Sequence, residues 1–285
     1  MHIWYLLPLC ANRVIIMINK EIVNRFIKKL EDLAAKIECI NSDDDEYELI
    51  LQLDHIILND VCTEEEENII LSSMNEAARI SIQNLYVNFE TKIEMSIDDL
   101  ISNHTDSQKF LFCNTRNLIV PYFKRYRDLV LRENNNLHVT ERDKVLWIGS
   151  GPFPSSSILL NDLTRCEIHC VDISEKAINN SKRIIKLLGK EKLISVNHQN
   201  GIDVDVENYS VIIIGVLAAP IDPIMKNIFE HMNSNTKILK RVTYGLRQLI
   251  YPTTQITVKA KYSLDNDDRA IGDQTISHII YNNGH

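Results

Sequence analysis

The stretch KVLWIGSGPFPSSSIL (144–159) decides the fold, because a short β-rich run leads directly into a glycine turn. Glycine has no Cβ, so the backbone of Gly149-Ser150-Gly151 can approach a ligand closely. A helix is expected from about Ser155, and the dipole at its N-terminus favours a negatively charged group. The stretch therefore predicts a strand, a ligand-binding turn and a helix.

Similar β-rich runs alternate with helical patterns through the second half of the chain. Continuous apolar runs of this kind are typical of strands buried on both faces of a parallel sheet. The predicted strands are KVLWIG (144–149), EIHCVD (167–172), LISVNH (193–198), SVIIIGV (210–216), TKILKRV (236–242), QITVKAKYS (255–263) and TISHIIYN (275–282). The last two have no helical pattern between them, which predicts an antiparallel edge of the kind found in methyltransferase-type Rossmann sheets.

The first half of the chain is expected to be helical. Apolar residues three or four apart predict one helix from Ile18, and acidic runs at 41–48 and 63–68 are typical of helix starts, with Thr63 as an N-cap. A metal site is the alternative for these carboxylates. A long helix is expected from about Glu65 to Leu100, and a further one over 117–135, with Pro121 in its first turn.

The predicted fold class is therefore α/β, with an N-terminal helical bundle followed by a Rossmann-like doubly wound sheet. A polar stretch near residue 140 places the boundary between a helical domain over 1–140 and a Rossmann-like domain over 141–285.

Composition narrows the class of partner. The 285 residues carry a net charge of −8 without a basic block, which argues against nucleic acid and favours a small molecule. Six scattered cysteines form no CxxC, and Cys166 and Cys170 flank a predicted strand, so we expect reduced core thiols and a cytoplasmic protein. The apolar residues 1–16 are too short to span a bilayer and lack the pattern of a signal peptide. No membrane partner is expected, and a homodimer is left open.

An acidic residue supports nucleoside binding at the glycine turn. Asp172 ends the strand that follows the turn, where a carboxylate can accept both ribose hydroxyls of a nucleoside. The alternative is that it caps the helix over 174–189. A pyrophosphate usually requires a third glycine in the turn, and Pro152 and Pro154 occupy that region. The turn therefore favours S-adenosylmethionine over a dinucleotide.

Four blocks, in order, resemble the nicotianamine synthase family and its bacterial relatives, the histidine 2-aminobutanoyltransferases of opine-metallophore pathways. The blocks are VPYFKRYRDLV (120–130), GSGPFPSSSI (149–158), VIIIGVLAAPIDPIMKNIF (211–229) and KRVTYGLRQLIYP (240–252). The last is similar to the family's R-x-x-x-G-x-R-x-x-x-Y-P segment.

The resemblance implies transfer of the 3-amino-3-carboxypropyl group of S-adenosylmethionine to an amine, with release of methylthioadenosine. It implies a catalytic role for Tyr122, which matches a family tyrosine, and for Glu90, which aligns with the family glutamate that handles the acceptor amine. Tyr126, four residues after Tyr122, shares its helix face and joins the catalytic candidates. The residues expected to bind S-adenosylmethionine are Gly149, Ser150, Gly151, Pro152, Asp172, Asn200 and Leu217.

Arg241 and Arg247 are the candidates for binding substrate carboxylates. Each candidate also has an alternative without a role in the site. The tyrosines could pack in the core, Glu90 could be a solvated helix residue, and the arginines could form ordinary ion pairs. Arg125 stands where the family has Asn, and Ser155 and Ser156 stand where bulkier residues are usual, so the acceptor pocket is expected to differ.

The acceptor, the number of transfers and closure of an azetidine ring stay open at this point. A small-molecule methyltransferase, a cyclase that makes azetidine-2-carboxylate and a non-catalytic nucleoside- or metal-binding protein are the alternatives. No metal is expected to take part in the chemistry, because the histidines show no shared ligand spacing.

Overall fold

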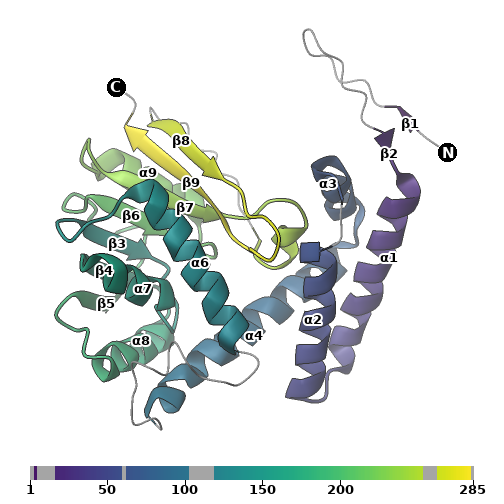
Figure 1. The fold of residues 1–285 in the computed structure, drawn as a ribbon, viewed down its shortest axis with the longest axis horizontal. Helices are drawn as coiled ribbons and strands as arrows, with labels where there is room; N and C mark the ends of the chain where they lie inside the picture. The colour runs from purple at the N-terminus through teal and green to yellow at the C-terminus, as the bar shows by residue number, and fades with distance from the viewer. Residues whose placement is uncertain (1–2, 5–16, 60–61, 103–118, 253–261, 284–285) are drawn as a thin grey trace. The chain divides into compact units, whose positions relative to one another are not determined.

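The computed structural model describes residues 3–4, 17–59, 62–102, 119–252 and 262–283 (Figure 1). The chain forms two compact units. Unit 1 comprises Met1–Val87 and Tyr244–Tyr251, and unit 2 comprises Asn88–Thr243 and Pro252–His285. The units do not follow the expected boundary near residue 140, because Ile97, Val130 and Leu137 of the preceding helices are buried in the core of unit 2.

Unit 1 consists mainly of helices. Its elements are β1 (Ile3–Trp4), β2 (Met17–Ile18), α1 (Lys20–Lys36), η1 (Ile37–Cys39), α2 (Asp43–Asn59), α3 (Glu64–Ser73), the beginning of α4 (Glu76–Ser102) and η2 (Gly245–Leu249). The predicted first helix is confirmed as α1. Asn19 caps it by accepting hydrogen bonds from the N–H groups of Glu21 and Ile22, and its apolar stripe buries Phe26 and Leu30.

The acidic runs start helices, as expected. The first run opens α2, and Thr63 caps α3. The Thr63 side chain accepts from the N–H of Glu66 at 3.3 Å, and a Glu66 carboxylate oxygen accepts from the N–H of Thr63 at 3.0 Å. This reciprocal capping box satisfies two backbone donors at the helix end.

The prediction of one long helix from about Glu65 to Leu100 is wrong in one respect, because the structure has two helices there, α3 and α4. Met74 is extended, with ψ at 146°. The Asn75 side chain then accepts hydrogen bonds from the N–H groups of Ala77 and Ala78, at 2.9 and 3.2 Å, and so begins a new helix. The apolar spacing continues across this break, which hides it in the sequence.

The segment after β7 (Lys237–Val242) returns to unit 1. Leu246, Leu249 and Tyr251 are buried there, and the Gln83 side chain donates to the carbonyl of Gln248 at 2.8 Å. The helical half of the fold is therefore completed by residues from near the end of the chain.

Unit 2 contains a seven-stranded sheet of order β5-β4-β3-β6-β7-β9-β8. Its strands are β3 (Lys144–Ile148), β4 (Glu167–Asp172), β5 (Ile194–His198), β6 (Val211–Ile214), β7 (Lys237–Val242), β8 (Tyr262–Asp268) and β9 (Ser277–Asn283). The first five are parallel, and β9 runs antiparallel to both β7 and β8. The predicted methyltransferase-type sheet with its antiparallel edge is confirmed, although β8 begins at Tyr262 and most of the stretch 255–263 lies outside the described residues.

Helices cover both faces of the sheet. They are α6 (Ile119–Leu137), α7 (Ser155–Thr164), α8 (Glu175–Leu187) and α9 (Ile221–His231). Alternate residues of β3 face opposite cores: Val145 and Trp147 pack with α6, α7 and α8, whereas Leu146 and Ile148 pack with α9. The strand order reverses on either side of β3, and ligands of open α/β sheets bind outside the carboxyl ends of the strands at such a point.

Candidate functional site

The glycine turn lies at the carboxyl end of β3. Gly149 and Gly151 have φ angles of +77° and +70°, in the left-handed region that favours glycine. The N–H of Gly149 donates to the carbonyl of Val171 at 2.9 Å, which continues the pairing with β4 past the end of the strand. A Cβ on Gly149 would be 3.1 Å from the Cβ of Ala218. The turn is thus fixed closely between the end of β4 and the segment that follows β6.

One side chain of this turn has an unsatisfied polar atom. Among the described residues, the buried hydroxyl of Ser150 has no hydrogen-bond partner. Buried polar atoms are nearly always paired in native proteins, so an orphan calls for an explanation such as a ligand or an ordered water. Its place between the two glycines fits a bound ligand at the turn.

Asp172 holds the turn from the end of β4. One carboxylate oxygen accepts from the N–H of Gly151 at 2.9 Å, and the other accepts from the N–H of Ser174 at 2.9 Å. The side chain that caps α8 is Ser174, which accepts from the N–H of Ala177. Each oxygen of a carboxylate can accept more than one hydrogen bond, so these contacts leave acceptor capacity for ligand hydroxyls.

Two large apolar side chains are exposed at the same edge of the sheet. Leu217 follows β6 and is 46% exposed, and Ile173 follows β4 and is 63% exposed. Ile173 was not among the residues predicted to bind the ligand. Its position directly after Asp172, the expected ribose-binding acid, could have suggested it. Asn200, after β5, is in a local turn in which its side-chain oxygen accepts from the N–H of Ile202 at 3.0 Å.

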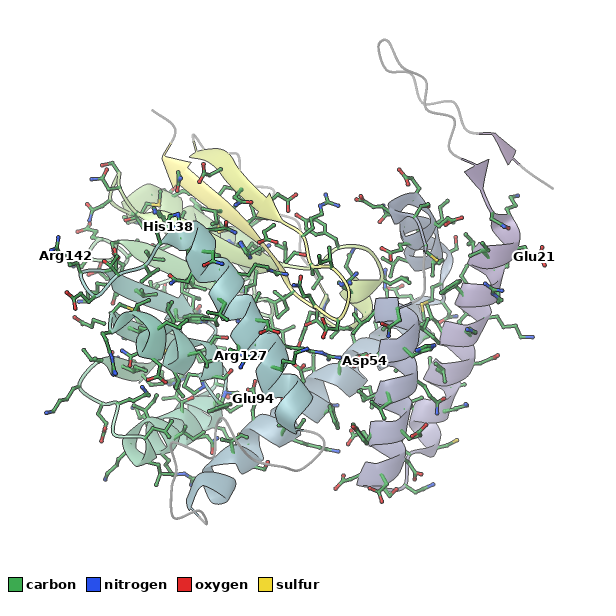
Figure 2. The ribbon with its side chains drawn as sticks, viewed as in Figure 1. Glu21, Asp54, Glu94, Arg127, His138 and Arg142 are labelled. Atoms are coloured by element: carbon green, nitrogen blue, oxygen red, sulfur yellow. The ribbon has the colours of Figure 1, made fainter. Side chains whose placement is uncertain are left out.

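A second carboxylate reaches the glycine turn from α4. A Cβ on Gly151 would be 3.1 Å from Glu94 Oε2. The Asn180 side chain donates to the carbonyls of both Glu94, at 3.3 Å, and Pro152, at 3.1 Å, and so fastens α4 to the turn. Glu94 is labelled in Figure 2. Glu90, the predicted carboxylate, is half-buried one helical turn earlier.

The two tyrosine candidates lie on α6. Tyr126 is half-buried and packs against the core beneath α6, α7 and α8. It also lines a small pocket with Arg125, Leu129, Arg132, Gln274, Thr275 and Ile276. Tyr122 belongs to the first turns of the helix, and its side chain lies outside the described residues.

The two arginine candidates lie in different units. Arg241, on β7, is 6% exposed and forms a two-pronged ion pair with Glu133 of α6, at 2.8 and 2.9 Å. Its guanidinium carbon is 4.9 Å from the centre of the Trp147 ring. Arg247 belongs to unit 1. There, burial raises the pKa of Glu67, and the charge of Arg247 lowers it by a smaller amount.

Burial also shifts the pKa values of two groups on the strands of the sheet. It raises the pKa of the Cys170 thiol to about 12 and lowers that of the Lys240 ammonium to about 8, with the charge of Asp222 opposing the second shift. Cys166 and Cys170 are buried free thiols, as predicted. In the part of the chain that the structure describes, no group of three or more His, Cys, Asp or Glu side chains could hold a metal ion. A helix long and apolar enough to cross a membrane is likewise absent from these residues.

Comparisons with known proteins show which family and which solved structures the chain is similar to. The family model described as "Nicotianamine synthase protein" matches residues 18–268. A mutant of MtNAS solved in complex with S-adenosylmethionine has a TM-score of 0.80 at 20% identity, covering 90% of this chain and 97% of that one. MtNAS in complex with MTA and tNA has a TM-score of 0.78 at 20% identity, covering 93% and 98%. A comparison with curated proteins gives no match.

Proposed function

Because the chain belongs to the nicotianamine synthase family, whose members transfer the aminocarboxypropyl group of S-adenosylmethionine and release methylthioadenosine, we propose that its acceptor is the amine of an amino acid. Histidine, glutamate or a similar amino acid is the proposed acceptor, and the product is a metallophore or its precursor. The MtNAS structure that contains MTA and tNA supports a small-molecule acceptor.

The observation that carries the proposal is the meeting of two carboxylates at one glycine turn. Asp172 accepts the N–H of Gly151, and Glu94 Oε2 lies 3.1 Å from the position of a Cβ on the same residue. S-adenosylmethionine has an adenosine at one end and the ammonium and carboxylate groups of methionine at the other, with the sulfonium between them. Asp172 would accept from the ribose hydroxyls, Ser150 would pair its hydroxyl with the ligand, and Ile173 and Leu217 would contact the adenine ring.

The chemistry is nucleophilic substitution at carbon. The amine nitrogen of the acceptor attacks Cγ of the methionine chain, the C–N bond forms, and the C–S bond breaks with its electron pair remaining on sulfur. Methylthioadenosine leaves as a neutral thioether, and the new ammonium loses one proton. Because the sulfonium has three electrophilic carbons, the position of the amine decides which of them reacts.

Carboxylates and phenols are the groups proposed to handle the proton. Glu94 takes it beside the glycine turn, and Glu90, one helical turn away, orients the acceptor amine. Tyr122 and Tyr126 of α6 are the phenols proposed to assist them. None of these steps requires a metal, and the reduced buried thiols support a reaction in the cytoplasm.

The acceptor subsite is proposed to include the pocket beside Tyr126. Arg125 lines that pocket, and a guanidinium suits an acceptor that carries a carboxylate. Arg247 remains a proposed partner for a substrate carboxylate. Arg241 already uses its guanidinium for Glu133, so we assign it to the support of the site.

An acceptor screen tests the proposal. The protein is incubated with S-adenosylmethionine and single amino acids, including both enantiomers of histidine and of glutamate, and the products are identified by mass spectrometry. Methylthioadenosine together with an acceptor heavier by one aminocarboxypropyl group is expected. Adenosylhomocysteine in its place would indicate methyl transfer and contradict the proposal. Azetidine-2-carboxylate formed without any acceptor would show that the reaction is a cyclisation.

A further inference from the structure

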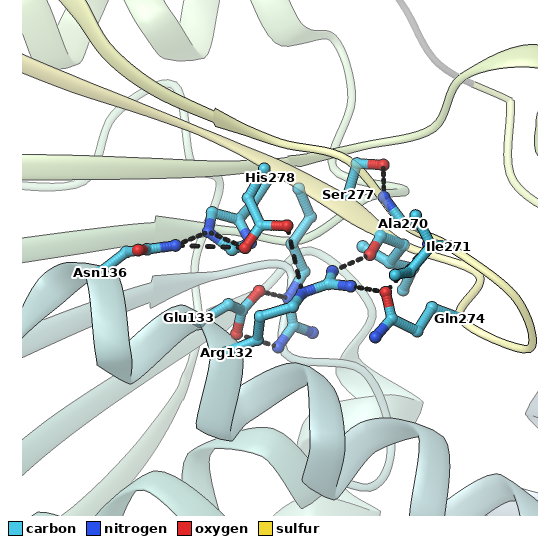
Figure 3. Close-up of polar contacts among 11 residues, drawn as sticks. Arg132, Glu133, Asn136, Ala270, Ile271, Gln274, Ser277 and His278 are labelled. Carbon is cyan, nitrogen blue, oxygen red and sulfur yellow. Dashed lines mark hydrogen bonds and ion pairs between the residues drawn. The ribbon is translucent and has the colours of Figure 1, made fainter.

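The buried ion pair between Glu133 and Arg241 connects three elements around the glycine turn. Glu133 points from α6 toward the sheet (Figure 3) and is 2% exposed. Arg241 Nε donates to one Glu133 oxygen at 2.8 Å, and Nη2 donates to the other at 2.9 Å. Nη2 also donates to the hydroxyl of Ser156 at 2.9 Å. Since Ser156 is in the first turn of α7, the arginine joins α6 to the helix that follows the turn.

Two serines of the run 155–157, Ser156 and Ser157, anchor this helix by their side chains. All three serines are buried. While Ser156 accepts from Arg241, the Ser157 hydroxyl accepts from the thiol of Cys170 on β4 at 3.3 Å. The first turn of α7 is therefore tied to β7 through one serine and to β4 through the next. Bulkier apolar residues at these positions could form neither hydrogen bond.

The electrostatics give Glu133 a specific part in this arrangement. A guanidinium beside a helix N-terminus is repelled by the positive end of the helix dipole. The Glu133 carboxylate compensates that charge, and the Trp147 ring, two residues before Gly149, contacts the guanidinium from the sheet side. If the carboxylate were absent, this buried cation would lose its two-pronged ion pair at the start of α7.

We infer that Glu133 is a positioning residue for S-adenosylmethionine, acting through Arg241 and Ser156 on the turn 149–154 and the start of α7. The inference rests on the proposed binding of S-adenosylmethionine at this turn. It concerns only affinity for that co-substrate, so it is independent of the acceptor. Glu133 itself is buried in the ion pair and does not contact the ligand.

The test measures affinity and stability separately in the full chain. The dissociation constant for S-adenosylmethionine is determined by calorimetry without an acceptor, and the urea midpoint of unfolding is measured for the same variants. Glu133→Gln places an amide N–H₂ group against an N–H of Arg241, and Ser156→Ala removes the last acceptor in the connection. Each is expected to raise the dissociation constant roughly tenfold. The double variant should bind S-adenosylmethionine no more weakly than the weaker-binding of the two single variants. The reason is that both substitutions break the same connection.

Ile228→Val is the matched control for lost stability. Ile228 is buried in α9 against the opposite face of the sheet, so this change should lower the urea midpoint and leave the dissociation constant unaltered. A Glu133→Gln protein that loses stability but binds S-adenosylmethionine like the unmodified chain would overturn the inference. If Glu133→Gln does not fold, Ser156→Ala, which removes a single oxygen, decides the question by the same measurement.

Asp172→Asn separates this inference from the assignment of the turn itself. Weaker binding by Asp172→Asn with unchanged binding by Glu133→Gln and Ser156→Ala would overturn the positioning role alone. Unchanged binding by all three variants would overturn both the positioning role and the assignment of S-adenosylmethionine to the turn. Weaker binding by all three supports both.

Discussion

The carboxylate of Glu94 lies against the backbone of Gly151, so that a Cβ on this glycine would be 3.1 Å from Glu94 Oε2. An acidic side chain from α4 and the glycine turn of the sheet therefore meet within unit 2. This relationship places a proton acceptor beside the turn at which we propose that S-adenosylmethionine binds.

Replacement of Glu94 by Gln should reduce turnover without weakening the binding of S-adenosylmethionine. Gln has nearly the same shape but cannot take a proton, and general base catalysis typically contributes 10²–10⁴-fold. We expect kcat to fall roughly a hundredfold and the dissociation constant for S-adenosylmethionine to change little. Glu90→Gln, one helical turn away, is the matched variant and should act mainly on the KM of the acceptor. Normal turnover by Glu94→Gln would refute the assignment of the base.

Replacement of Gly151 by Ala should disturb both the turn and the neighbouring carboxylate. The φ angle of +70° is strained for alanine, and the new methyl group would press on Glu94. Gly189→Ala is the control, since its φ is +64° but no atom lies within 4 Å of the new Cβ position. Both variants should lose similar stability in urea, and only Gly151→Ala should bind S-adenosylmethionine less tightly. Equal binding by the two would show that the turn is not the ligand site.

Replacement of Asp172 by Asn should weaken the binding of S-adenosylmethionine by roughly 10- to 100-fold. An amide has one oxygen, so it cannot accept from both Gly151 and Ser174 and also receive ribose hydroxyls. Calorimetry measures the change, with the exposed Asp203→Asn as the control. Comparable losses in the two variants would point to a general effect of charge.

The stability of the protein should decrease as the pH falls below about 6.5, the ordinary pKa of histidine. His278 is fully buried, and burial lowers its pKa. The charges of Arg132 and Arg241 lower this pKa further, and those of Glu133 and Asp268 raise it, but the net shift is downward. Since the folded pKa is below the unfolded one, the unfolded chain takes up the proton first as the pH falls, which favours unfolding.

Urea midpoints between pH 8 and pH 5.5 measure this dependence. His278→Gln should make the decrease shallower, whereas the exposed His231→Gln should not. An identical pH dependence in His278→Gln and the unmodified protein would mean that other groups are responsible.

Thiol reactivity should follow burial. Cys39 is exposed and is expected to react readily with a thiol reagent at pH 8, whereas Cys170, with a pKa of about 12, should react only on unfolding. Cys166 is also buried, and its pKa is raised. Peptide mass spectrometry after brief labelling identifies the modified cysteines. Labelling of Cys170 in the folded protein at a rate similar to that of Cys39 would contradict the described packing of β4.

The sequence predicted those parts of the fold that depend on local patterns. The turn at Gly149 and Gly151, the strand that ends at Asp172, and the cap at Thr63 each follow from residue types within a few positions. The helix break at Asn75 was missed because the apolar period continues through it. The sequence did not show that Glu94 lies beside the glycine turn, since a helix face alone does not show which carboxylate meets a turn almost sixty residues later. The role of Glu90 stays a prediction.

The ion-pair partner of Arg241 could not be predicted from the sequence either. Arg241 resembled a substrate-binding residue by its position in a family block, whereas its ion pair depends on Glu133, more than a hundred positions earlier. In the serine run, only Ser155 and Ser156 were noted, as smaller than the usual residues. The role of Ser156 and Ser157 as hydrogen-bond acceptors appears once β4 and β7 are placed beside α7.

The membership of Tyr244–Tyr251 in unit 1 has a consequence for the order in which the protein is made. The helices α1 to α3 leave the ribosome early, but Leu246, Leu249 and Tyr251, which are buried in the same unit, are synthesised only after β7. The core of the helical unit therefore cannot be completed until five strands of the sheet have been translated. Until then, the apolar surface that these three residues cover lacks its partners.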